Sequence, residues 1–109
     1  MGDTSGMNPP DVPAPVSVIH RPEASRFEVE TDGHLSVLTY QLEAEGRRVA
    51  FDHTGVPAAL QGRGIAAELV SAGLDWARAE GLQVLPRCSY VAVYMRRHPD
   101  TLALLEPRA

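Results

Sequence analysis

The 109-residue sequence contains no lysine and only one cysteine. All ten basic residues are therefore arginine, and the chain has no side-chain amine of its own. A single cysteine excludes an internal disulfide and fits a reducing compartment, so we expect a cytoplasmic protein. No apolar run approaches the roughly 20 residues that a membrane-spanning helix needs. The N-terminus also lacks the basic and apolar regions of a secretory signal.

Positive charge is scarce as well. The formal net charge is −4 and the pI is near 5.5, which argues against nucleic acid as the main partner because phosphate backbones call for a basic face. No spacing of His, Cys, Asp and Glu residues resembles a metal site. Hydrophobic residues make up 44% of the chain and charged residues 22%, an ordinary balance for a globular domain. The length suits a single domain with one modest core.

The organisation changes along the chain. Residues 1–16 are rich in proline and glycine and nearly free of large apolar side chains, so we expect a disordered tail followed by one folded domain at residues 17–109. Alternating apolar and polar runs, separated by turn residues, then predict three or four consecutive antiparallel strands. These runs lie at residues 16–20, 26–30, 35–43 and 48–56.

The second half of the chain has a helical period. Residues 64–80 carry apolar side chains at the spacing of one helix face, and Gly81 stands where a left-handed C-cap is expected. Residues 82–85 predict a short buried strand. Residues 88–98 predict a second, shorter helix, which Pro99 ends.

The most informative motif joins the two halves and reads Gln61-Gly62-Arg63-Gly64-Ile65-Ala66. Two glycines permit backbone dihedrals that other residues avoid and let a ligand approach the main chain closely. The helix that begins here directs unpaired N–H groups and the positive end of its dipole at whatever lies in front. Arg63 adds a charge with fork geometry suited to phosphate oxygens. The motif therefore predicts a pyrophosphate-binding loop.

Other interpretations of this loop remain open. The pattern Gly62-x-Gly64-x-x-Ala67 also satisfies a loose dinucleotide fingerprint, which requires an acidic residue at the end of the next strand. That strand is followed instead by Pro86-Arg87-Cys88. A P-loop is excluded because no Gly-Lys-Ser/Thr follows. The loop could also be a turn without a ligand.

The pattern Gln/Arg-x-x-Gly-x-Gly/Ala resembles the acetyl-CoA loop of the GNAT superfamily of N-acetyltransferases. With His53-Thr54-x-Val56-Pro57 and Cys88-x-Tyr90-x-x-x-Tyr94, the chain looks like the short YjdJ-type branch of that superfamily. The resemblance spans roughly residues 17 to 100. It implies a compact α+β fold with a mixed, mostly antiparallel sheet, a long helix after the glycine loop, a second shorter helix, and no first-half helices.

The resemblance also assigns binding roles. It implies that residues 61–66 hold the pyrophosphate of acetyl-CoA, and that the backbone of Thr54, Gly55 and Val56, on a bulged strand, pairs with the pantetheine arm. Acetyl-CoA is thus the expected acyl-donor cosubstrate, and no metal is expected. The cleft should lie where two neighbouring strands splay apart.

Three side chains are candidates for the chemistry. Cys88 opens a helix next to Arg87, an environment that lowers a thiol pKa, although it could instead be a small buried apolar residue. His53 precedes the pantetheine-contacting backbone, and histidine titrates near neutral pH, as a base for an amine must. Tyr94 is a candidate acid by resemblance, but an alignment of the helix starts puts Met95 at the family's tyrosine position, and Tyr90 and Tyr94 could simply pack on one helix face.

These observations predict a GNAT-type N-acetyltransferase that moves an acetyl group from acetyl-CoA to an amine by direct transfer. The acceptor is a small molecule or a protein amine, and the protein is a monomer or weak dimer with neither a nucleic-acid nor a membrane partner. Two alternatives stay open: a CoA-binding protein with little turnover, and a thioesterase that uses Cys88.

Overall fold

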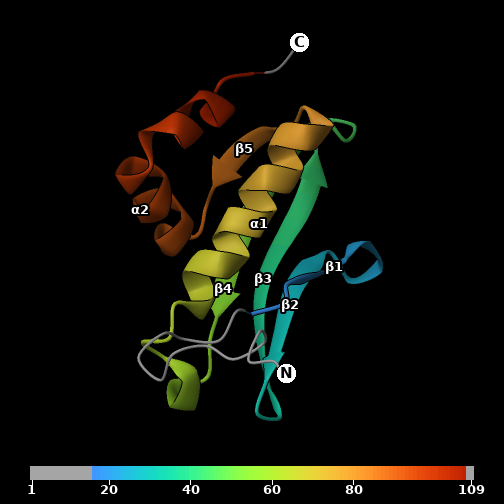
Figure 1. Ribbon diagram of the computed structural model, residues 1–109. Helices are drawn as coiled ribbons and strands as arrows, with labels where there is room; N and C mark the ends of the chain where they lie inside the picture. Colours follow the sequence, from blue (N-terminus) through green and yellow to red (C-terminus); the bar gives the residue numbers. More distant parts are fainter. Residues whose placement is uncertain (1–15, 108–109) are drawn as a thin grey trace, which may run out of the picture.

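The computed structural model describes residues 16–107, so the predicted tail lies outside the described residues except for Val16. The described chain forms one five-stranded sheet, two α-helices and three short 3-10 helices (Figure 1). In chain order the elements are β1 (Ile19–Arg21), η1 (Pro22–Ala24), β2 (Arg26–Thr31), β3 (His34–Glu43), β4 (Arg48–Gly55), η2 (Ala58–Leu60), α1 (Ile65–Glu80), β5 (Gln83–Pro86), α2 (Ser89–Arg97) and η3 (Pro99–Leu105).

The sheet has the strand order β1-β2-β3-β4-β5. The first four strands pair antiparallel with their neighbours, and β5 pairs parallel with β4. Asp32 and Gly33 both have positive φ, of 52° and 78°, as a two-residue hairpin turn between β2 and β3 requires. The parallel pair needs a crossover, which α1 provides. The mixed, mostly antiparallel α+β fold predicted from the sequence is therefore confirmed.

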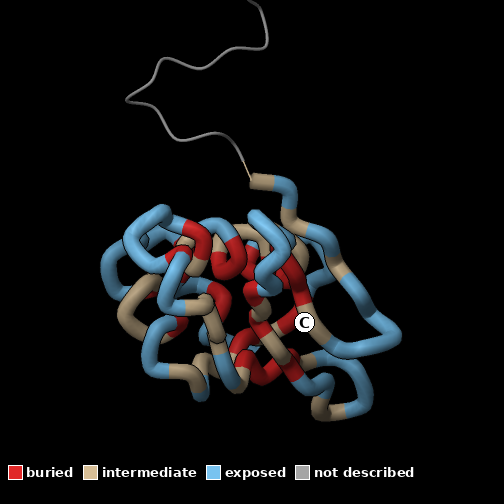
Figure 2. The backbone as a smooth tube through the Cα atoms, turned by 90° about the horizontal axis from the view of Figure 1, so that it is seen from below, coloured by how far each residue is buried: buried red, intermediate tan, exposed pale blue. Residues whose placement is uncertain are grey.

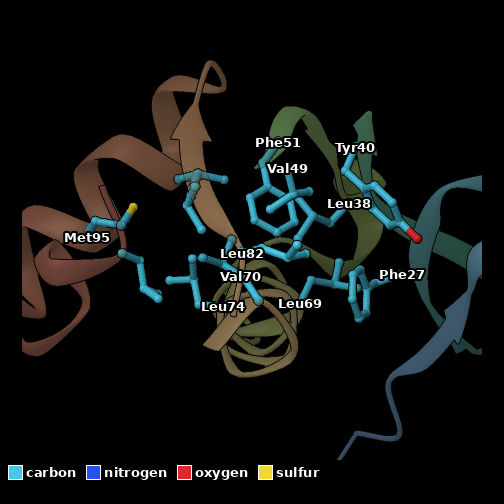
Figure 3. Packing of buried hydrophobic residues seen from close by; sticks show 14 of the residues in the cluster. Phe27, Leu38, Tyr40, Val49, Phe51, Leu69, Val70, Leu74, Leu82 and Met95 are labelled. Atoms are coloured by element: carbon cyan, nitrogen blue, oxygen red, sulfur yellow. The ribbon is translucent and has the colours of Figure 1, made fainter. Parts of the chain in front are cut away.

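Helix α1 lies across one face of the sheet and buries its apolar stripe there (Figures 1 and 3). Leu69, Val70 and Leu74 are each at most 2% exposed and pack in the same cluster as Leu38 and Phe51 from the strands. Figure 2 shows the buried residues of the chain gathered toward the middle of the molecule, with exposed segments around them. Gly81 has the predicted left-handed C-cap geometry, with φ of 70°, and Gly64 at the other end of the helix is also left-handed, with φ of 79°.

The register between β3 and β4 contains one irregularity. Thr39 pairs with His53, whereas the next residue, Tyr40, pairs with Phe51, so Asp52 is an extra residue in β4. This is the pattern of a β-bulge, which bends the strand and increases its twist. The parallel ladder between β4 and β5 ends at the same point, because its last pair is Phe51 with Pro86. Beyond the bulge, β4 pairs only with β3.

One detail differs from the sequence-based expectations, because the first strand begins at Ile19 rather than at residue 16. After the second helix the chain continues as η3, in which Leu104 is only 2% exposed and belongs to the core cluster. A 3-10 helix lacks the 3.6-residue period, so the sequence gave no helical signal for this segment.

The tight contact between α1 and the sheet yields a stability prediction. A Cβ atom added at Gly73 would lie 2.9 Å from a methyl carbon of Leu38 and 3.0 Å from the ring of Phe51. Overpacking of this kind costs about 1–3 kcal/mol, more than the roughly 1 kcal/mol that alanine gains over glycine in a helix. We expect Gly73→Ala to lower the free energy of unfolding, measured by urea denaturation.

Ala72→Gly is the matched control, because it reverses the change at the neighbouring position of the same helix. Helix propensity alone would make Gly73→Ala stabilising and Ala72→Gly destabilising, whereas the packing contact makes both destabilising. An increase in stability for Gly73→Ala would show that α1 does not approach the sheet this closely.

Candidate functional site

A cleft of about 440 Å³ opens beside the distal half of β4, in front of the first turn of α1. Its lining comes from β4, from the connection that contains η2, from the start of α1 and from α2. The lining residues are Thr54, Val56, Leu60, Gln61, Gly62, Gly64, Ile65, Ala66 and Tyr90. The fold thus brings Tyr90 to the same cavity as the glycine loop and the residues that follow the bulge. These segments are far from Tyr90 in the sequence.

The glycine loop forms one wall with its main chain. Gly62 and Gly64 have φ of 86° and 79°, a region that other residues rarely adopt, and a Cβ at either position would meet nothing within 4 Å. Gly64 caps α1 without any side-chain hydrogen bond. The N–H groups of Ile65 and Ala66 belong to the first turn, which has no intrahelical acceptors. The wall therefore offers open space, backbone donors and a positive helix end to a ligand.

The side chains of the loop are used locally. Gln61 donates from Nε2 to the carbonyl of Val56 over 3.2 Å, which ties the loop to the end of β4. Arg63 forms an exposed ion pair with Asp32 in the β2–β3 turn, with 3.2 Å between Nη1 and Oδ2. Arg63 is not among the residues that line the cleft. In this arrangement the guanidinium predicted to bind phosphate braces the loop instead.

Cys88 and Thr54 meet across the point where β4 and β5 part. Thr54 Oγ1 lies 3.3 Å from Cys88 Sγ, and the N–H of Cys88 donates to the carbonyl of Phe51 over 2.9 Å. Cys88 is half-buried at the N-cap of α2 and its sulfur makes no regular capping hydrogen bond. The thiol thus borders the cleft through Thr54.

The surroundings of the Cys88 sulfur favour its thiolate. Burial alone would raise the pKa of this thiol. The Thr54 hydroxyl and the backbone N–H groups of Val91, Tyr90 and Thr54 act in the opposite direction and outweigh it, so the pKa lies below its ordinary value. The lowered pKa that the sequence predicted is supported.

The predicted contribution of Arg87 to that shift is wrong. The Arg87 guanidinium is directed at Glu43, with Nη2 3.2 Å from Oε1 and a second, shorter contact from Nη1 to Oε2. Arg48 binds the same carboxylate. These two arginines hold the pKa of Glu43 below its usual range, the Arg87 hydrogen bond being the larger cause. Arg87 therefore links β3 to the end of β5 and does not act on the thiol.

His53 lies on the other face of the sheet. It pairs with Thr39, whereas Thr54 pairs with the buried Leu38, so successive residues of β4 face opposite sides. His53 is exposed, and its Nε2 would be 3.1 Å from a Cβ added at Gly55. The imidazole therefore packs over Gly55 on the face away from α1. Cys88 and His53 border the same stretch of β4 from opposite sides.

The two tyrosines of α2 are separated by their surroundings. Tyr90 is 42% exposed and lines the cleft. Tyr94 lines a second hollow between α1 and α2 and stacks on His98, with ring centroids 3.9 Å apart. The structure therefore brings Tyr90, not Tyr94, to the cleft. The sequence suggested the two as possible packing partners on one helix face and did not distinguish their surroundings.

Leu60 is a further wall residue that the motif search missed. It is 1% exposed and sits in η2 between β4 and the glycine loop.

Among the described residues, no group of three or more His, Cys, Asp or Glu side chains is placed to hold a metal ion. Across residues 16–107, neither α-helix has the length and apolar character needed to span a membrane.

Comparisons with known proteins agree with this architecture. The sequence model of the GCN5-related N-acetyl-transferase family matches residues 26–104. This chain is 36% identical over 88 residues to Protein NATD1 from Mus musculus and to Protein NATD1 from Homo sapiens. Each alignment covers 78% of this chain, together with 78% of the mouse protein and 76% of the human protein. An NMR structure of a GCN5-like putative N-acetyltransferase from Staphylococcus aureus aligns with a TM-score of 0.62 at 23% identity, covering 78% of this chain and 82% of that one.

The contact between Thr54 and Cys88 predicts a change in thiol reactivity. Thr54→Val removes the hydroxyl donor while keeping the shape of the side chain, so the pKa of the Cys88 thiol should rise. Because a hydrogen bond to a partly exposed charged group contributes about 1 kcal/mol, the reaction with iodoacetamide at neutral pH should slow roughly three- to tenfold. The measurement is the alkylation rate as a function of pH.

Thr39→Val is the matched control, because the Thr39 hydroxyl reaches the carbonyl of His53 at 3.5 Å and not the sulfur. This variant should leave the pH profile of alkylation in place. An identical profile for wild type and Thr54→Val would show that the hydroxyl does not act on the thiolate.

Proposed function

Because the chain belongs to the GCN5-related N-acetyltransferase family, we propose that it transfers an acetyl group from acetyl-CoA to an amine. The observation that carries this proposal is the cleft beside β4 beyond its last pair with β5, which opens onto a helix start built from glycines of positive φ. Within the described residues the only helix before β4 is the three-residue η1. That compact first half supports membership of the short YjdJ-type branch.

The main chain around the cleft fits the donor. We assign the pyrophosphate to the N–H groups at Gly62, Gly64, Ile65 and Ala66, where the open space beside both glycines admits a close ligand. The backbone of β4 after the bulge has no partner strand on the β5 side. Thr54, Gly55 and Val56 can therefore pair with an extended pantetheine arm, as an added strand would. Acetyl-CoA supplies the thioester whose acetyl group passes to the acceptor.

His53 and Cys88 are assigned different duties because they lie on opposite sides of β4. An amine that approaches over the exposed face meets His53, which accepts the proton that the amine loses. Cys88, on the α1 side, shares its hydrogen bond with Thr54 and, as the thiol, donates its proton to the departing CoA sulfur. Holding donor and acceptor in one complex lowers the activation barrier by roughly 7–11 kcal/mol, so we favour direct transfer over an acetyl-cysteine route.

We further propose a cytoplasmic monomer or weak dimer as the acting species.

The first test of the proposal is donor binding. Acetyl-CoA should stabilise the protein by about 2.7 kcal/mol at 100 times its dissociation constant, measured as a rise in melting temperature. Gly64→Val should abolish that rise, because a branched side chain would fill the space beside the loop.

Gly46→Val is the matched control for backbone strain. Gly46 has φ of 83° and open space like Gly64, but lies in the β3–β4 turn away from the cleft. Both variants should melt earlier than wild type, and only Gly46→Val should retain the response to acetyl-CoA. Stabilisation by NAD or ATP in place of acetyl-CoA would contradict the proposal.

The second test concerns the direct route with His53 as base. His53→Ala should lower kcat roughly 10²–10⁴-fold, the range of general acid–base catalysis, and should leave acetyl-CoA affinity unchanged. The rate should be followed as CoA release across a panel of amines and pH values. Mixed with acetyl-CoA and no amine, the enzyme should keep its intact mass, which is easily read because the chain contains no lysine.

Exposed His34, the first residue of β3, gives the control variant His34→Ala, which should keep full activity. One added acetyl group that disappears in Cys88→Ala would establish the covalent route instead. CoA release without amine would indicate a thioesterase, and binding without turnover of any amine would indicate a CoA-binding protein.

A further inference from the structure

The Glu43 carboxylate joins three strands of the sheet. It lies at the end of β3, and its Oε1 is 3.3 Å from Nη2 of Arg48 on β4 and 3.2 Å from Nη2 of Arg87, which follows β5. Nη1 of Arg87 binds Oε2 as well, so the guanidinium holds both oxygens in a bidentate pair. The Glu43 side chain is 21% exposed and that of Arg87 is 50% exposed. The less exposed carboxylate thus anchors the longer arginine.

Glu43 and Arg87 meet across β4. The registers pair Ala50 with Gln41 of β3 and with Leu85 of β5. Glu43 lies beyond Gln41 toward the start of β4, whereas Arg87 lies beyond Leu85 toward its end. Both side chains therefore have to reach back over Ala50 to form their contact, and the small methyl group at that position leaves them room. The pair fastens the end of β5 to β3.

Arg87 directly precedes Cys88, where the chain leaves the sheet. Pro86 has no N–H and ends the ladder. The next backbone bond to β4 runs from the N–H of Cys88 to the carbonyl of Phe51 over 2.9 Å. One hydrogen bond allows rotation about its own axis, and the clamp on Arg87 provides a second attachment that opposes this rotation. The contact at risk is the 3.3 Å approach of Cys88 Sγ to Thr54 Oγ1.

We propose that Glu43 is a positioning residue, which fixes Cys88 against Thr54 by holding Arg87. Neither Glu43 nor Arg87 lines the cleft, so the effect passes through the backbone between Arg87 and Cys88. The inference rests on the proposed function only for its effect on turnover, because the state of the thiol can be followed without any substrate.

The charges around the pair define what a pH profile reports. The two arginines hold the pKa of Glu43 below its usual range, with the Arg87 hydrogen bond as the larger cause, so the carboxylate stays ionised where a thiol titrates. The Glu43 hydrogen bond is also the largest cause of the raised pKa of Arg87, ahead of the charge of Asp52 in the bulge. Both partners therefore keep their charges through the neutral and alkaline range, and the clamp persists there.

The test follows the alkylation of Cys88 by iodoacetamide as a function of pH. Glu43→Gln and Arg87→Gln should each raise the midpoint of the profile by about half to one pH unit, as expected when the Thr54 hydrogen bond is lost. The double variant should shift it no further, because both changes break one attachment. In a Thr54→Val background, Glu43→Gln should add nothing. In acetyl transfer, Glu43→Gln should lower kcat about three- to tenfold and leave the KM for acetyl-CoA unchanged.

Glu28→Gln is the matched control, because Glu28 also binds two arginines, Arg21 and Arg26, but lies on β2. This variant should leave the alkylation midpoint and kcat unchanged. The titratable side chains of His53, beyond β4, and Tyr90, on α2, are the same in every variant. Circular dichroism should show all variants folded.

The proposal is overturned by unchanged midpoints in Glu43→Gln and Arg87→Gln. A lower midpoint in Glu43→Gln alone would also overturn it, because the released guanidinium would then act on the thiol through its charge. Raised midpoints in a protein that transfers no acetyl group would support the positioning of Cys88 and overturn the proposed function.

Discussion

The extra residue in β4 is the constraint on which the arrangement of the site depends. Side chains along a strand alternate between the two faces, so one inserted residue reverses the facing of everything that follows. Phe51 faces α1 with Tyr40, and without the bulge His53 would face α1 as well and Thr54 would face away. With Asp52 inserted, Thr54 turns toward Cys88 and His53 toward the open face. A single insertion thereby separates the thiol from the imidazole.

The β4–β5 ladder ends in the same region of the chain. Pro86 has no N–H to continue the pairing, and the N–H of Cys88 instead bonds to the carbonyl of Phe51. The backbone thus leaves β5 and begins α2 within two residues. This places the first-turn N–H groups of α2 beside the Cys88 sulfur, while α1 presents its own first turn to the cleft. The positive N-terminal ends of two helices therefore lie close to Thr54 and the cleft.

The sequence was most informative where a local rule decides the structure. The glycine at the end of α1 and the alternating strands were predicted correctly because each pattern depends on neighbouring residues alone. The branch of the family, the donor and the catalytic roles remain predictions. Ion pairs between distant residues could not be predicted from the sequence, because nothing local indicates that Arg63 pairs with Asp32 or that Arg87 pairs with Glu43. The resemblance implied a bulge before the loop, but only the register locates it at Asp52.

The unpaired backbone of β4 beyond the bulge has a further consequence, for self-association. A strand edge with free N–H and C=O groups is a template for pairing with another chain. At the outer edge of this sheet that hazard is limited, because β1 has only three residues and is followed by Pro22. Residues 52–55 carry the same hazard, but Thr54 among them lines the cleft, whose other walls include the start of α1 and Tyr90 of α2. The fold thus leaves the unpaired edge of β4 accessible to a narrow, extended ligand and shields it from strands of other molecules.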